Sequence, residues 1–188
     1  MSHGHALVEG DNKKIAILIS VLALLLAIAE TLGKSAQTSA LKYNVEASNL
    51  WAFFQAKTIR KTTMETAAEQ MEVDVQLARD PAVKALLEKR AGAWKTRAAR
   101  YESEPDTQEG RKELMARAKA LEAKSELALA KYHQFEIASA AFQIAIVLAS
   151  SYLITGVAYL LWCAGGVGVV GVFFAAIGVV APNAIHLF

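Results

Sequence analysis

The last fifty-two residues of the chain, from Ile137 to Phe188, contain no Lys, Arg, Asp or Glu. A charge-free stretch of this length excludes an ordinary soluble domain, because one membrane-spanning helix needs only about 20 apolar residues. The stretch is long enough for two spanning helices and a turn. The chain also has only one cysteine, Cys163, which excludes an intrachain disulfide and indicates no redox compartment.

Patterns typical of an enzyme are also missing from the sequence. It contains no Cys/His cluster and no Gly-rich phosphate loop before a helix, and no catalytic group of His, Asp or Ser with Lys lies in its apolar segments. His3 and His5 flank a glycine, but a defined metal site needs three or four ligands. We therefore expect a polar, flexible tail over residues 1–13, and no enzymatic activity, cofactor, metal or small-molecule substrate.

A first membrane-spanning helix is predicted at residues 14–33, because residues 15–29 are apolar except for Ser20. A cleaved signal peptide is the alternative, but the residues that follow the apolar segment form a poor cleavage site. Glu30 lies in the last turn, where Lys34 is four residues further on. We predict an interfacial ion pair between Glu30 and Lys34 in preference to a proton-relay carboxylate.

Residues 34–136 hold most of the charge and are rich in Ala, Lys, Glu, Leu, Gln and Arg, which are strong helix formers. A water-exposed helical segment is therefore predicted. Asp80 before Pro81 is typical of a helix start, and residues 103–110 form a second break. A tip near residues 80–81 gives the better match between arm lengths, so the segment is predicted to be an antiparallel helical hairpin.

The charges favour the same arrangement. The arm before the tip is acidic near its end and the returning arm is basic, and folding at the tip brings Glu65 level with Lys95 and Lys61 level with Glu102. Because the basic run meets acidic partners on the same chain, we expect no nucleic-acid binding.

The returning arm carries a repeat at 4-3 spacing, which is typical of a coiled-coil seam. Its members are Leu114, Ala118, Leu121, Ser125, Ala128, Tyr132 and Phe135. Small seam residues bury little apolar area, so a lone hairpin gains little hydrophobic stabilisation. We therefore expect further copies of the chain to pack with it as a homo-oligomer.

An aromatic group lies on the outgoing arm, where Trp51 and Phe54 share one helix face and Phe53 points elsewhere. It is predicted to be a packing cluster opposite the 103–110 break, not a ligand site. The block NVEASNLWAFFQAKTIRKT around it, together with the preceding GKSAQT and the leading apolar helix, resembles an uncharacterised bacterial membrane family, domain of unknown function 4337. The resemblance covers essentially the whole chain and implies no activity, cofactor or catalytic residue.

The C-terminal region is predicted to form a second spanning helix at residues 137–163 and a third at 166–182, with a turn at Gly165 and Gly166. A stripe of small residues follows 4-3-4-3 spacing there: Ala164, Gly168, Gly171, Ala175 and Gly178. Such a stripe lets helix backbones approach closely in lipid. Its partner is left open between the first or second helix of the same chain and a second subunit.

The sequence thus predicts an all-α membrane protein with three transmembrane helices and a long water-exposed antiparallel helical hairpin between the first and second. The first functional hypothesis is a non-enzymatic homo-oligomer that acts as a scaffold or docking stalk at the bacterial cytoplasmic (inner) membrane, with membrane lipids and its own copies as partners. A pore-forming channel or transporter subunit is the alternative.

A third hypothesis is that Lys34, Lys42 and Lys131 bind anionic lipid head groups. Lysines near the apolar segments favour a cytoplasmic hairpin, although the pair that precedes the first helix favours the reverse.

Overall fold

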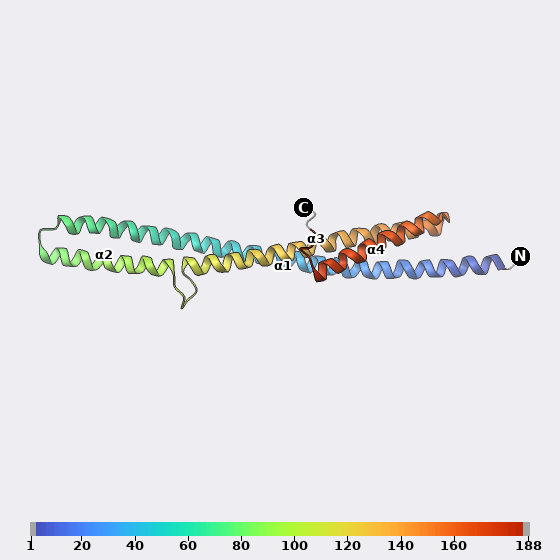
Figure 1. Cartoon of the computed structure of the whole chain (residues 1–188), viewed down its shortest axis with the longest axis horizontal. Helices are drawn as coiled ribbons and strands as arrows, with labels where there is room; N and C mark the ends of the chain where they lie inside the picture. Colours follow the sequence, from blue (N-terminus) through green and yellow to red (C-terminus); the bar gives the residue numbers. More distant parts are fainter. Residues whose placement is uncertain (1–2, 186–188) are drawn as a thin grey trace. The chain divides into compact units, whose positions relative to one another are not determined.

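A computed structural model describes residues 3–185 of the chain, with side chains from Asn12 onward (Figure 1). This range consists of four α-helices without a strand: α1 (His3–Leu77), α2 (Pro81–Glu102), α3 (Arg111–Thr155) and α4 (Ala158–Val180). The chain divides into two compact units. We call residues 42–124 the hairpin unit, and residues up to 41 together with those from 125 onward the apolar unit.

The predicted flexible tail is helical from residue 3, as the first turns of α1, and residues 1–2 lie outside the described residues. The prediction is wrong for residues 3–13. The physical reason is that a helix already nucleated at the following apolar stretch extends at little cost through good helix formers such as Ala, Leu and Glu.

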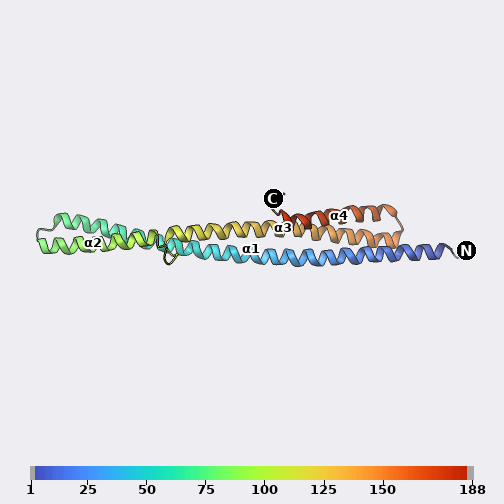
Figure 2. The same cartoon turned by 60° about the horizontal axis from the view of Figure 1, so that its bottom comes forward.

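In the hairpin unit the tip lies where the sequence predicts it. α1 ends at Leu77, and α2 begins at Pro81 with Asp80 as its N-cap, whose side chain accepts a hydrogen bond from the Ala82 N–H at 2.8 Å. After the tip, α2 lies beside the last part of α1 and antiparallel to it in both views (Figures 1 and 2). Most of the side chains buried in the hairpin unit are small, namely Ala47, Ala68, Ala91, Ala98 and Ala118, and the larger buried ones are Lys57 and Leu114.

In the apolar unit, α1, α3 and α4 pack around Phe142 of α3, whose side chain is 1% exposed. The buried cluster consists of Leu22, Ala29, Ala138, Phe142 and Ala145. Figure 2 shows α4 lying alongside the later part of α3. All three helices are long and apolar enough to cross a membrane, and their most apolar segments have mean hydropathies of 2.6, 1.9 and 2.3.

The turn between the last two helices is not at Gly165 and Gly166, and that prediction is wrong. α3 ends at Thr155, and Gly156 takes a left-handed conformation with φ of 71°. Its N–H donates to the Tyr152 carbonyl at 2.8 Å, which closes the end of the helix. Gly165 and Gly166 lie inside α4 because glycine is tolerated in apolar helices. The second apolar segment therefore ends at residue 155, and the third begins at residue 158.

Candidate functional site

The aromatic group of α1 binds side chains of the neighbouring helix α3 within the hairpin unit. The Trp51 Nε1–H donates to Glu122 Oε1 at 2.6 Å, and the Trp51 and Phe54 rings meet edge to face at 5.4 Å between centroids. The Arg111 guanidinium lies over the Phe54 ring, 4.9 Å from its centroid. Trp51 and Phe54 therefore share a face, as predicted, and the group is a packing cluster next to the 103–110 break.

Phe53 lies on another face and contacts Lys57, a residue that the sequence did not single out. The Lys57 Nζ is 5.3 Å from the centre of the Phe53 ring and 5.4 Å from that of Tyr101 on α2. Its side chain is only 8% exposed, and its ion pairs with Glu104 and Glu109 measure 3.9 and 3.8 Å. A buried ammonium needs such partners, because an isolated buried charge is strongly destabilising.

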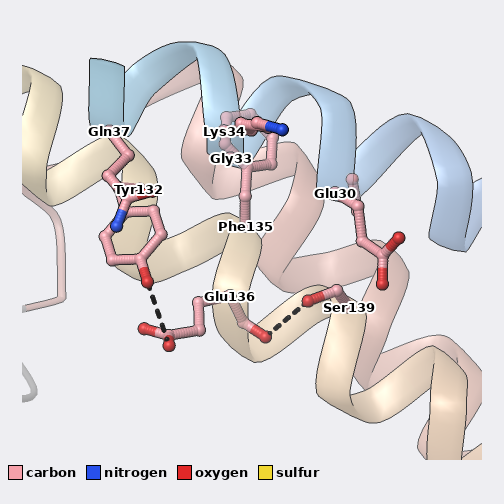
Figure 3. Close-up of a pocket in the computed structure, with 9 residues that line it drawn as sticks. Glu30, Gly33, Lys34, Gln37, Tyr132, Phe135, Glu136 and Ser139 are labelled. Carbon is pink, nitrogen blue, oxygen red and sulfur yellow. Dashed lines mark hydrogen bonds between the residues drawn. The ribbon is translucent and has the colours of Figure 1, made fainter. Parts of the chain in front are cut away.

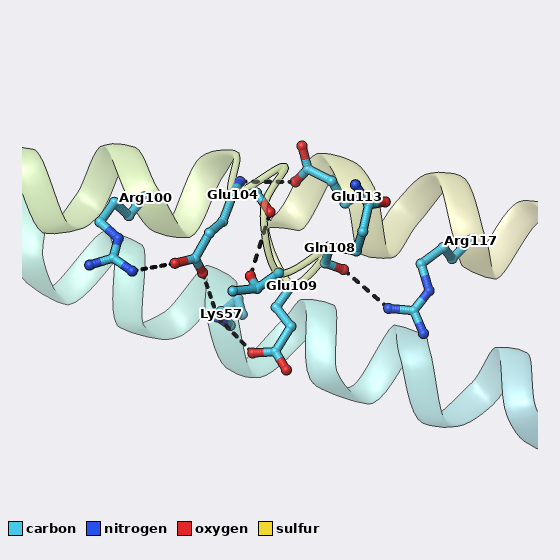
Figure 4. Close-up of polar contacts among 8 residues, drawn as sticks. Lys57, Arg100, Glu104, Gln108, Glu109, Glu113 and Arg117 are labelled. Carbon is cyan, nitrogen blue, oxygen red and sulfur yellow. Dashed lines mark hydrogen bonds and ion pairs between the residues drawn. The ribbon is translucent and has the colours of Figure 1, made fainter.

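The break between α2 and α3 is held by carboxylates (Figure 4). Glu113 accepts from the Ser103 hydroxyl at 2.7 Å and from the Glu104 N–H at 3.2 Å. Arg100 pairs with the Glu104 side chain, and the Arg117 Nη1 donates to the Gln108 carbonyl at 3.1 Å. The loop is therefore ordered by hydrogen bonds from both flanking helices.

The predicted pairing between the arms is confirmed near this break. Nearer the tip, the observed partners differ from the predicted ones. Lys61 donates to Glu102 at 2.8 Å, as predicted. Lys95, however, pairs with Glu72 instead of Glu65. Glu102 also accepts from Arg111 at 2.6 Å, so α1, α2 and α3 meet at one carboxylate.

Acid should destabilise the hairpin unit. The hydrogen bond from Lys61 holds the pKa of Glu102 below its usual 4.5, and hydrogen bonds from Arg100 and Ser103 lower the pKa values of Glu104 and Glu113. Because the folded carboxylates bind protons less readily than the unfolded ones, their contribution is present above about pH 4.5 and is lost as the pH falls through the lowered folded values. Melting of the full chain, followed by circular dichroism from pH 7 to pH 3, should show this loss.

The variant Glu102→Gln should melt at a lower temperature than the wild type at pH 7 and lose less stability on acidification, because it removes one of the three carboxylates whose pKa values are lowered by these hydrogen bonds. Glu88→Gln, at an exposed carboxylate of α2, is the matched control. Equal melting temperatures and equal pH dependence of the two variants would contradict the role of Glu102 in the acid sensitivity.

The first residues of the 4-3 seam of α3 are buried against other helices of the same chain. Leu114 and Ala118 have no exposed surface, and Leu121 is half-buried. The Ser125 hydroxyl donates to the Ala40 carbonyl at 2.9 Å. Further copies of the chain cannot reach Leu114 and Ala118, so a contact between copies needs other side chains.

The small-residue stripe of α4 also packs within the chain. A Cβ added at Gly171 would lie 2.7 Å from the Phe142 ring, one at Gly178 would lie 3.1 Å from Phe135, and one at Gly168 would lie 3.2 Å from Leu22. Ala164 is buried and Ala175 packs against the apolar cluster. Of the two partners left open by the sequence, the structure shows the first and second apolar helices of the same chain.

The predicted ion pair between Glu30 and Lys34 does not occur among the ion pairs of the described residues. Glu30 Oε1 instead accepts a hydrogen bond from the Gln143 Nε2 of α3 at 3.1 Å. The Glu30 carboxylate points towards α3 and away from the Lys34 ammonium (Figure 3). The side-chain amide of Gln143, on another helix, therefore takes the place of Lys34 as the partner of Glu30.

Gln134 was also missed by sequence reasoning. Its buried Nε2 donates to the carbonyls of Pro182 and Ile185 at 3.2 and 3.0 Å, which ties the segment after α4 to α3. Its neighbours His133 and Glu136 are also polar, so no local pattern singles it out.

The described residues provide no group of three or more His, Cys, Asp or Glu side chains placed to hold a metal ion. Within them the architecture is that of an all-helical protein with three candidate membrane spans and a helical hairpin between the first two. Residues 11–181 match the family model described as domain of unknown function (DUF4337), and the chain belongs to that family. No curated protein and no solved structure matches the chain.

Proposed function

We propose that the chain is a non-enzymatic, homo-oligomeric protein of the bacterial cytoplasmic membrane and that its hairpin unit acts as a scaffold or docking stalk. The three apolar helices support insertion into a membrane. Lysines beside the apolar segments favour a cytoplasmic hairpin unit. Cleavage of the hairpin unit by trypsin added outside intact spheroplasts would contradict that placement.

The observation that carries the proposal is an uncharged stripe on α1, opposite the face that packs within the hairpin unit. Its side chains follow 3-4 spacing, and we call them the outer seam: Val45, Ser48, Ala52, Gln55, Ile59, Thr62 and Thr66. All seven are exposed, with Val45 at 59% and Ile59 at 68%. This is the spacing at which one helix packs against another in a coiled coil.

The exposed surfaces of α2 and α3 in the hairpin unit carry many charges. Exposed residues of α2 include Lys84, Glu88, Lys89, Arg90 and Lys95, and those of α3 include Lys112, Lys119 and Glu122. A helix face that remains in water usually carries such residues. The outer seam lacks them over about six turns, which is typical of a surface that another helix covers.

A second copy of the chain is the occupant that the outer seam fits. Copies inserted in the same orientation present the same seam at the same distance along α1 from its apolar segment, so they meet in parallel and in register. The apolar members Val45, Ala52 and Ile59 all occupy the same seam position, so each meets its own copy across a parallel contact. Flanking pairs across a parallel contact, such as Trp51 with Ala56 and Thr58 with Thr63, place no like charges together.

Placing a charge in the seam should separate the copies. Ala52→Glu puts identical carboxylates opposite each other, and we expect dissociation to be at least about tenfold easier because facing like charges are costly. Ala123→Glu is the matched control, since Ala123 is an exposed alanine on α3. Native mass spectrometry of the full chain in nanodiscs should give one defined oligomer for the wild type and the control, and mainly monomers for Ala52→Glu. A monomeric wild type would contradict the proposed function.

A further inference from the structure

The apolar unit contains a cavity of about 690 Å³ between the apolar part of α1 and the first half of α4. On α1 it is lined by Lys14, Ile15 and Leu18, and on α4 its lining residues fall between residues 158 and 169. Tyr152 of α3 also lines it. The volume is within the range of about 300–1,000 Å³ that is usual for small-molecule sites. The cavity therefore has room for a ligand between three helices of one chain.

The cavity begins where α1 and α4 stop touching each other. At Gly168 the two helices are in close contact, because an added Cβ would lie 3.2 Å from the Leu22 side chain. Just before it in the chain, Gly165 and Gly166 both line the cavity, and a Cβ added at either would meet nothing within 4 Å. Packing against another helix of the described residues therefore explains Gly168 but not the two preceding glycines. Their lack of side chains widens the cavity instead.

The lining of the cavity is apolar apart from one end. Lys14 is the only charged residue among the described lining residues, and it directly precedes the apolar stretch of α1. In a membrane it lies at the level of the lipid phosphates, to which its positive charge is complementary. Tyr152 and Trp162 also line the cavity, and such aromatic side chains are common near that level. From this end the cavity extends to the level of the lipid hydrocarbon.

The cavity is too narrow for a helix of another copy of the chain. The part of α4 that lines it rises about 17 Å, at about 1.5 Å per residue, so its mean cross-section is about 40 Å². A helix with its side chains is about 10–12 Å across and needs about twice that area. An acyl chain is a single file of methylene groups and is much thinner than a helix. The dimensions therefore favour an acyl chain.

We propose that this cavity binds one acyl chain of a membrane phospholipid, whose phosphate lies beside Lys14. The chain lies between Leu18 and the glycine pair, and it contacts both α1 and α4 where they do not touch each other. Packing of this kind holds apolar groups together in a membrane, where no hydrophobic driving force acts between them. The proposal rests on the membrane insertion proposed above, and it is independent of the outer seam and of the oligomer.

Photocrosslinking of the full chain in nanodiscs tests the site. The probe is phosphatidylcholine with a diazirine in the middle of one acyl chain, and the labelled residues are identified by mass spectrometry. We expect labelling of residues 158–169 to exceed that of residues 172–180 about fivefold, as the summed dispersion energy of several new contacts permits. Gly166→Leu, which fills the cavity from α4, should remove most of this excess. Leu18→Phe, which fills it from α1, should do the same.

The control is Ala176→Leu, which adds the same bulk at an exposed position of α4 outside the cavity and should leave the labelling pattern unchanged. Resistance of the protein to extraction from native membranes by alkaline washing checks insertion separately, so failure of the proposed function is distinguishable from failure of the site. In an inserted protein, equal labelling of the two segments would overturn the proposal. An excess that neither Gly166→Leu nor Leu18→Phe lowers would also overturn it.

Discussion

Gly171→Ala is expected to destabilise the packing of α4 by about 1–3 kcal/mol, the usual cost of inserting a methyl group into a packed core. The added Cβ would lie 2.7 and 2.8 Å from two carbons of the Phe142 ring. That ring is buried among the three helices of the apolar unit, so it has little room to move. Thermal unfolding of the full chain in detergent, followed by circular dichroism, should show a clear loss.

The same substitution at Gly165 is the matched control. Gly165 lies in the same helix, and a Cβ there meets nothing within 4 Å. Gly165→Ala should therefore leave stability unchanged or raise it slightly through better helix propensity. Phe142→Leu combined with Gly171→Ala should recover part of the loss, because the smaller side chain makes room for the methyl group. Equal effects of the two alanine variants would show that α4 packs elsewhere.

Gly110→Ala is expected to destabilise the hairpin unit by at least about 2 kcal/mol, because backbone atoms have to move. A Cβ at position 110 would lie 2.4 Å from the Glu104 nitrogen and 2.7 Å from the Ser103 Cα. It would also displace the Glu113 carboxylate that bonds to both residues. Hydrogen exchange of the α2 amides in the full chain should become faster.

Gly92→Ala is expected to act in the opposite direction. Gly92 lies inside α2 with no atom within 4 Å of an added Cβ, so alanine should stabilise the helix by about 0.5–1 kcal/mol. Hydrogen exchange of the same amides should become slower. A faster exchange in this variant would show that α2 is not the uninterrupted helix described.

The breaks of the hairpin unit were predictable because their signals are local. Asp80 caps α2 directly and Pro81 occupies its first position, so two adjacent residues determine the tip. The turn after α3 was misplaced because glycine alone does not mark a turn in an apolar run. A correcting signal was present: the small-residue stripe passes through Ala164 and Gly168 at helical spacing, which requires an unbroken helix across Gly165 and Gly166.

Contacts between distant parts of the chain could not be predicted from spacing. Gln143 is 113 residues from Glu30, and it binds the carboxylate that the sequence assigns to Lys34. Lys57 is buried because Tyr101 and Glu104 of the returning arm cover it. Both contacts depend on the relative rotation of two helices, which sequence periodicity determines only roughly.

The proposed contact between copies concerns a different face from the one that the sequence favours. The α3 seam carries the stronger hydrophobic pattern, but it is occupied within the chain. The outer seam of α1 is weaker in apolar residues, and it is identified only once the packed face of the helix is known. Its polar members, such as Gln55 and Thr62, are of the kind that specify alignment between strands at some cost in stability.

Disulfide crosslinking at the outer seam tests this contact most directly. In a parallel, in-register contact the two copies of position 52 face each other closely enough for a disulfide. With Cys163→Ala to remove the native thiol, Ala52→Cys should form disulfide dimers in native membranes under mild oxidation, while Ala123→Cys on α3 should remain monomeric. Absence of dimers at position 52, or equal dimer formation at both positions, would contradict a homo-oligomer assembled through α1.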